Sequence, residues 1–146
     1  MENDFYLDRY LDLPGLLGQK SYFLLGPRQT GKSCLIRHSF HDVRVYNLLD
    51  NNLFLQLSRD PGRLAQEVLQ DDQIIIIDEI QRLPELLNEV HRIIEEKGIR
   101  FLLTGSSARK LRQKGVNLLG GRARTKYLHP FIFAELKGRF DLTQAL

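Results

Sequence analysis

Short apolar runs separated by amphipathic stretches make up the basic pattern of this chain. The runs at 21–26 (SYFLLG) and 73–78 (QIIIID) are almost continuously apolar, which is typical of strands buried on both faces of a parallel sheet. Weaker runs of the same kind lie at 44–49, 99–105 and 123–129. We expect each of these five segments to form a strand.

Helical patterns lie between these runs. Residues 84–98 begin with a proline and end at a glycine, and their apolar positions recur every three to four residues along one stripe. Further helices are predicted at 32–40, 61–70 and 106–119. The pair Asn51–Asn52 indicates a helix cap after the run at 44–49. Strands that alternate with helices predict an α/β fold, with a parallel sheet covered by helices on both faces.

The composition limits the domain organisation and the location of the protein. A chain of 146 residues that is 42% hydrophobic can build one domain with a sizeable core, so we expect a single domain over 1–146. No apolar run approaches the roughly 18 residues that span a bilayer, and the acidic N-terminus does not resemble a signal peptide. The single cysteine, Cys34, cannot form an internal disulfide. These features predict a cytoplasmic protein without a membrane partner.

The positive charge of the chain is concentrated in one segment. Residues 97–126 contain nine basic and no acidic residues, whereas the rest of the chain holds 12 basic and 18 acidic residues. Such a segment is expected to meet nucleotide phosphates, nucleic acid or the acidic part of a neighbouring copy of the chain. We rank a nucleic-acid partner low, because no groove-reading motif accompanies the charge. For residues 109–114, a solvated basic helix face is an equally good interpretation.

The stretch GPRQTGKS, which follows the first apolar run, matches the phosphate-binding pattern G-x-x-x-x-G-K-[ST]. Glycine at both ends lets the backbone curl so that successive N–H groups point at phosphate oxygens, and the next helix adds its positive N-terminus. A lysine at this place can reach the β- and γ-phosphates, and the serine hydroxyl can bind Mg²⁺. The alternative is a plain turn between a strand and a helix. The nucleotide-binding residues that we predict are Gly26, Pro27, Arg28, Gln29, Thr30, Gly31, Lys32, Ser33 and Cys34. Cys34, on the first helix face, is also expected to reach the core.

A pair of carboxylates, Asp78 and Glu79, follows four consecutive isoleucines. In α/β sheets ligands bind at the carboxyl ends of the strands, so Asp78 can join Ser33 in holding Mg²⁺. Glu79 can polarise a water for attack on the γ-phosphate. Many strands end in acidic residues, and that is the alternative interpretation. The position of Asp78, 46 residues beyond Lys32, favours a hydrolytic site.

Hydroxyl groups end the next predicted strand. If this strand lies between the other two, Thr104 or Ser106 can orient the attacking water. A second interpretation, compatible with the first, is a serine cap at Ser106 or Ser107 that begins the following helix.

A further cation, Arg122, follows a Gly–Gly pair before the last predicted strand. At such a junction an arginine can neutralise charge on a γ-phosphate held by a neighbouring subunit. The alternatives are phosphate binding within the same chain and a surface salt bridge. Arg124 is the second candidate for the same role.

Five stretches together support a resemblance to a known family: GPRQTGKS, IIIIDEIQRLPELL, FLLTGSSARKL, LLGGRA and LHPFIFAEL. From about residue 6 to 142 the chain resembles the prokaryotic AAA-type ATPases that carry a C-terminal domain of unknown function. The resemblance implies a five-stranded parallel sheet in the order 2-3-4-1-5, with ATP and Mg²⁺ bound and ATP hydrolysed. It also implies roles for Lys32 and Ser33 (phosphate and metal), Asp78 (metal), Glu79 (base) and Arg122 (finger-like arginine).

Members of that family are usually longer than this chain. We therefore expect residues 1–20 to be a helical lead-in and residues 131–146 to be the start of a truncated C-terminal continuation. The leading hypothesis is a Mg-ATP hydrolase with Glu79 as base. The alternatives are a nucleotide-binding module without significant catalysis, because its C-terminal part is missing, and an ATP-dependent protein associated with nucleic acid.

Overall fold

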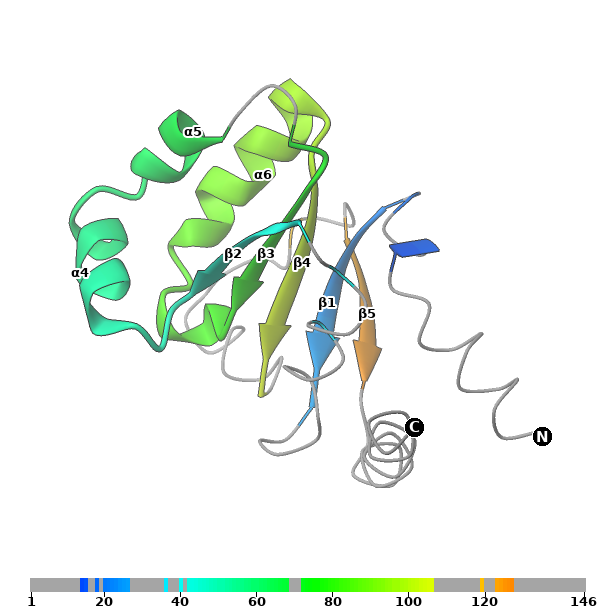
Figure 1. Ribbon diagram of the computed structural model, residues 1–146, viewed down its shortest axis with the longest axis horizontal. Coiled ribbons are helices and arrows are strands. Elements are labelled where there is room, and N and C mark those ends of the chain that lie inside the picture. Colours follow the sequence, from blue (N-terminus) through cyan, green and yellow to red (C-terminus); the bar gives the residue numbers. More distant parts are fainter. Residues whose placement is uncertain are drawn as a thin grey trace.

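A five-stranded parallel sheet forms the centre of the computed structural model (Figure 1). The structure describes residues 14–15, 18, 20–26, 36, 40, 42–68, 72–106, 119 and 123–127. The strands are β1 (Ser21–Leu25), β2 (Arg44–Asn47), β3 (Ile74–Asp78), β4 (Arg100–Gly105) and β5 (Ala123–Tyr127). Their order is β2-β3-β4-β1-β5, and every neighbouring pair is parallel. The predicted strands, the α/β class and the sheet order are therefore confirmed.

The described helices follow β2 and β3 in the chain. They are α4 (Asn51–Arg59), α5 (Arg63–Glu67), the 3₁₀ turn η1 (Ile80–Arg82) and α6 (Leu86–Lys97). Helix α6 confirms the prediction for 84–98, and its end is fixed by the left-handed Gly98 (φ 68°), whose N–H bonds to the Ile94 carbonyl at 3.0 Å.

Two predictions about the helices need correction. The helix predicted at 61–70 is only α5, because Val68 already has extended backbone angles (φ −71°, ψ 124°). Before it lies α4, which the sequence signalled only as a cap at Asn51–Asn52. The capping residue is Asp50, whose Oδ1 accepts hydrogen bonds from the Asn52 and Leu53 amides at 3.0 and 3.4 Å.

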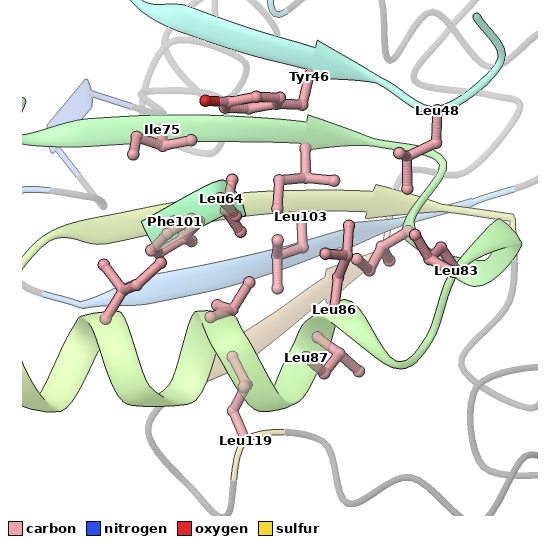
Figure 2. Packing of buried hydrophobic residues seen from close by; sticks show 14 of the residues in the cluster. Tyr46, Leu48, Leu64, Ile75, Leu83, Leu86, Leu87, Phe101, Leu103 and Leu119 are labelled. Carbon is pink, nitrogen blue, oxygen red and sulfur yellow. The ribbon is translucent and has the colours of Figure 1, made fainter. Parts of the chain in front are cut away.

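Alternate residues of the inner strands build a core on the sheet face that α4, α5 and α6 cover (Figure 2). Strand residues of this core include Phe23, Leu25, Ile75, Ile77, Phe101 and Leu103. They meet helix residues that include Leu57, Leu64, Leu86, Leu87, Val90 and Ile93.

The opposite face of the inner strands is buried too. There the residues Tyr22, Leu24, Ile76 and Leu102 are at most 5% exposed. Burial on both faces explains why β1, β3 and β4 read as continuous apolar runs. The outer strands β2 and β5 carry the half-exposed Val45 and Tyr127.

Several expectations fall on other parts of the chain. The helix predicted at 32–40 and the one at 106–119 lie mostly outside the described residues, as do the N-terminal lead-in and the continuation at 131–146. Within the described part of the chain, no helix has the length and apolar character that crossing a membrane requires.

Candidate functional site

The ends of β1, β4 and β3 lie side by side at the carboxyl edge of the sheet. Leu25 of β1 is in register with Gly105 of β4, and the Gly26 amide donates to the Gly105 carbonyl at 3.1 Å. On its other side, β4 pairs with β3 up to Leu103 and Ile77, one residue before Asp78. Strand β4 lies between β1 and β3, which is the condition under which the sequence predicted a role for the hydroxyls at its end.

The Thr104 hydroxyl joins the two carboxylate residues. Its side chain is completely buried, and Oγ1 accepts a hydrogen bond from the Glu79 amide at 3.0 Å. The same hydroxyl donates its proton to Asp78 Oδ1. A hydroxyl can donate one proton and also accept through its lone pairs. The single Thr104 oxygen therefore holds both the Glu79 backbone and one oxygen of Asp78.

The backbone at Glu79 adopts a left-handed conformation, with φ 63° and ψ 51°. This conformation costs a residue with a Cβ roughly 1–2 kcal/mol, and such strain is found most often at functional sites. The hydrogen bond that the Glu79 amide donates to Thr104 Oγ1 and the start of η1, where the Arg82 amide donates to the Glu79 carbonyl at 3.1 Å, hold it in place. Glu79 is only 8% exposed, so an acidic residue is buried at the end of β3.

Two polar side chains at this edge contain buried oxygens that lack a partner among the described residues. Gln81 of η1 donates from Nε2 to Glu79 Oε2, while its Oε1 is buried without a donor in that part of the chain. The Ser106 hydroxyl is likewise buried, with no partner in the described ranges. Buried polar atoms without partners are rare in proteins, and each suggests a missing ligand or water.

A family model described as an AAA domain matches residues 18–137, which is most of the chain. The chain belongs to the AAA-domain family. The resemblance to AAA-type ATPases read from the sequence motifs is thus confirmed for the AAA domain. The strand order is consistent with the P-loop NTPase fold of this family. Family membership indicates a nucleotide-binding protein of ATPase type. A comparison with curated proteins found no match.

Of the site residues predicted from the sequence, the AAA domain brings Gly26, Asp78, Glu79, Thr104 and Ser106 to one edge of the sheet. The other predicted residues lie outside the described part: Pro27, Arg28, Gln29, Thr30, Gly31, Lys32, Ser33, Cys34 and Arg122. The alternative cap residue Ser107 lies outside it as well.

Sequence reasoning assigned no role to two residues of η1 that the AAA domain places beside the site. Gln81 contacts Glu79 directly. Arg82 donates from its guanidinium to the Leu48 carbonyl at 2.9 Å and lies 4.8 Å from the centre of the Phe54 ring. Arg82 therefore connects η1 both to the segment between β2 and α4 and to α4 itself. Both residues closely follow a strand that ends in acidic residues, and this position in the sequence could have indicated that they lie near the site.

The donor chemistry of this edge fits a hydrated magnesium ion. Mg²⁺ prefers oxygen ligands and usually keeps several waters, so that one or two protein oxygens suffice. The Asp78 carboxylate supplies such oxygens, and Thr104 orients it through Oδ1. In the described ranges, no group of three or more His, Cys, Asp or Glu side chains is arranged to hold a metal ion by itself.

Proposed function

We propose that this AAA domain binds Mg-ATP at the carboxyl edge of its sheet and hydrolyses the γ-phosphate. The observation that carries the proposal is the hydrogen-bonded arrangement of Asp78 with the buried Glu79 and Thr104. It lies at the same edge of the sheet as Gly26, the residue at which the phosphate-binding motif begins. A carboxylate that could act as a base and a carboxylate that could hold a metal thus lie at the sheet edge at which the phosphate-binding motif begins.

Binding of the nucleotide rests on the sequence motif from Gly26 to Ser33. Its backbone amides and the Lys32 ammonium would hold the phosphates, and Cys34 follows directly in the sequence. Ser33 and Asp78 would hold Mg²⁺, which when bound neutralises charge on the β- and γ-phosphate oxygens. This charge balance makes the γ-phosphorus open to attack by an oxygen nucleophile.

In the hydrolytic step Glu79 acts as general base. Its carboxylate takes a proton from a water molecule while the water oxygen forms a bond to the γ-phosphorus. The bond between that phosphorus and the oxygen bridging to the β-phosphate breaks, and ADP leaves with the electron pair as inorganic phosphate forms. Because Glu79 is buried, few other waters compete for its carboxylate.

The two hydroxyls at the end of β4 take different parts in this proposal. Thr104 donates a hydrogen bond to Asp78 and accepts one from the Glu79 amide, so it would position both acids. Ser106, whose oxygen has no partner among the described residues, is the hydroxyl suited to orient the attacking water. Arg122 of a neighbouring copy would neutralise charge on the γ-phosphate, which makes a homo-oligomer the proposed working form.

The decisive experiment replaces Glu79 by glutamine and measures steady-state ATP hydrolysis and ATP affinity in parallel. Glutamine keeps the shape of the side chain but cannot accept the proton, so we expect kcat to fall by about 10²- to 10⁴-fold. The dissociation constant for ATP should change by less than about threefold, because the base does not hold the phosphates.

Glu96→Gln is the matched control, since Glu96 is an exposed glutamate on α6, and it should keep the wild-type kcat. An active Glu79→Gln variant would reject Glu79 as the base. Wild-type protein that binds ATP but turns over no faster than Glu79→Gln would reject hydrolysis and leave a nucleotide-binding module.

A further inference from the structure

Gln81 lies in the turn η1, two residues after the base that we propose. The left-handed backbone at Glu79 turns the chain so that the two side chains meet, and the Gln81 amide nitrogen donates a hydrogen bond to Glu79 Oε2. A glutamate side chain has several rotatable bonds, and a donor fixed in the same turn restricts them. The contact therefore bears on the orientation of the Glu79 carboxylate.

Within the described residues, only one of the two polar atoms of the Gln81 amide, the nitrogen, has a hydrogen-bond partner. Its Oε1 is buried, and the described part of the chain offers it no donor. An apolar side chain of similar size would avoid this unsatisfied oxygen. A local arrangement that breaks a stability rule in this way is expected where function requires it.

Gly105 at the end of β4 provides the space for this amide. A Cβ at Gly105 would lie 2.8 Å from Gln81 Oε1 and 3.3 Å from Leu25 Cδ2. The first distance is shorter than van der Waals contact, so a larger residue at 105 would push the amide aside. Gly105 lies in a regular strand without a positive φ, so space rather than backbone conformation favours glycine here.

We infer that Gln81 is a positioning residue for the side-chain carboxylate of the catalytic base, and that Gly105 leaves the space for its amide. The inference rests on the proposed hydrolytic function. By holding Oε2 of Glu79, the Gln81 amide leaves Oε1 of Glu79 as the oxygen that takes the proton from water. A base held in one orientation meets the water in the reactive geometry more often, which raises kcat rather than ATP affinity.

The test measures ATP turnover against ATP concentration for Gln81→Met and Gln81→Glu between about pH 5 and pH 8. Methionine fills similar space without a donor, so we expect kcat to fall about 10- to 100-fold while KM changes less than about threefold. Gln56→Met, at an exposed position of α4, is the matched control and should leave kcat unchanged.

The Gln81→Glu variant separates positioning from packing. At neutral pH the introduced carboxylate cannot donate a hydrogen bond and repels Glu79, so kcat should fall at least as far as in Gln81→Met. The like charge of Glu79 raises the pKa of the introduced carboxyl, and at acid pH its proton restores a donor. The kcat ratio of variant to wild type should therefore rise as the pH falls. At acid pH it should exceed the ratio for Gln81→Met, because both introduced side chains are then neutral but only the carboxylic acid donates a hydrogen bond.

A double-mutant cycle tests the part of Gly105. Gly105→Ala should lower kcat because the added methyl group displaces the Gln81 amide, a change at the end of a flexible side chain. In the Gln81→Met background the same substitution should cause little further loss, since no amide remains to be displaced. Circular dichroism of each variant confirms that it is folded.

The outcomes distinguish this inference from the function on which it rests. A wild-type enzyme that depends on Glu79, combined with a Gln81→Met variant of unchanged or higher kcat, overturns the inference and leaves the proposed function standing. The same holds if Gln81→Glu follows the wild-type pH profile, or if the losses from Gln81→Met and Gly105→Ala simply add. Wild-type protein without turnover above the Glu79→Gln blank overturns both.

Discussion

The same strands serve two regions of the molecule that differ in kind. On the face under α4, α5 and α6, strand residues such as Ile77 and Phe101 are fully buried apolar side chains that fill volume. One or a few residues further along the same strands lie Asp78 and Thr104, and the Thr104 hydroxyl makes specific hydrogen bonds to Asp78 and to the Glu79 amide. The core stabilises the fold through packed volume, whereas the carboxyl edge depends on individual atoms.

The edge also contains features that cost stability. Glu79 has a strained left-handed backbone, and buried oxygens of Gln81 and Ser106 lack partners among the described residues. A stable core nearby can compensate for such costs, which are of the order of 1–3 kcal/mol each. The comparison predicts that core variants act mainly on stability and edge variants mainly on turnover.

The largest effect on stability is expected from Phe101→Ala. The Phe101 side chain is completely buried between the strands and α6 (Figure 2), so its removal leaves a cavity. We expect the free energy of unfolding to fall by about 3–5 kcal/mol, measured by urea denaturation. Leu55→Ala, at a half-exposed position of α4, is the control and should cost less than about 0.5 kcal/mol. Equal losses in the two variants would contradict the assignment of the core.

The apolar pattern of the sequence was sufficient to predict the strands, because residues buried on both faces leave an uninterrupted run such as Ile74–Ile77. It did not delimit α4. Polar residues surround the few apolar positions there. The sequence prediction placed the helix cap at Asn51–Asn52, whereas the capping residue is Asp50. A cap depends on which side chain reaches the free amides, and composition alone does not determine this.

For the candidate site, the acidic and hydroxyl residues at the sheet edge could be named from their type and place: Asp78, Glu79, Thr104 and Ser106. The supporting residues could not. The contact of Gln81 depends on the left-handed turn at Glu79, a conformation that no sequence pattern predicts for a glutamate. The space at Gly105 depends in turn on that contact.

An intermediate effect on stability is expected at the border between core and edge. Thr104→Val keeps the shape of the side chain but removes the acceptor for the Glu79 amide and the donor to Asp78. A buried N–H without a partner costs about 1–3 kcal/mol, and we expect that loss in urea denaturation together with reduced ATP turnover.

Thr104→Ser is the matched control for this variant because it keeps the hydroxyl and loses only a methyl group. It should retain most of the turnover of the wild-type protein. A valine variant with the turnover of the serine variant would show that the hydroxyl does not position the two acids. The edge would then resemble the core, with shape mattering more than individual hydrogen bonds.

The smallest effect is expected at Tyr46, whose polar atom lies at the core and has a partner. The ring belongs to the core, and its hydroxyl donates to Glu67 Oε2 at 3.0 Å. Burial, followed by the Glu67 carboxylate, raises the pKa of Tyr46 to about 12. Since an unfolded tyrosine has a pKa of about 10, the folded state favours the neutral phenol. This stabilisation is complete below about pH 10 and is lost as the pH rises towards about 12.

Urea denaturation at several alkaline pH values measures this contribution. Tyr46→Phe should lower the free energy of unfolding by about 1 kcal/mol at neutral pH and should lose part of the decline seen in the wild type above about pH 10. Tyr127→Phe, at a half-exposed ring, should keep that decline. If Tyr46→Phe kept it as well, the hydroxyl would not be held by Glu67. A polar atom with a partner at the core would then have no more effect than an exposed one. The contrast with the buried edge oxygens that lack a partner among the described residues would lose its basis.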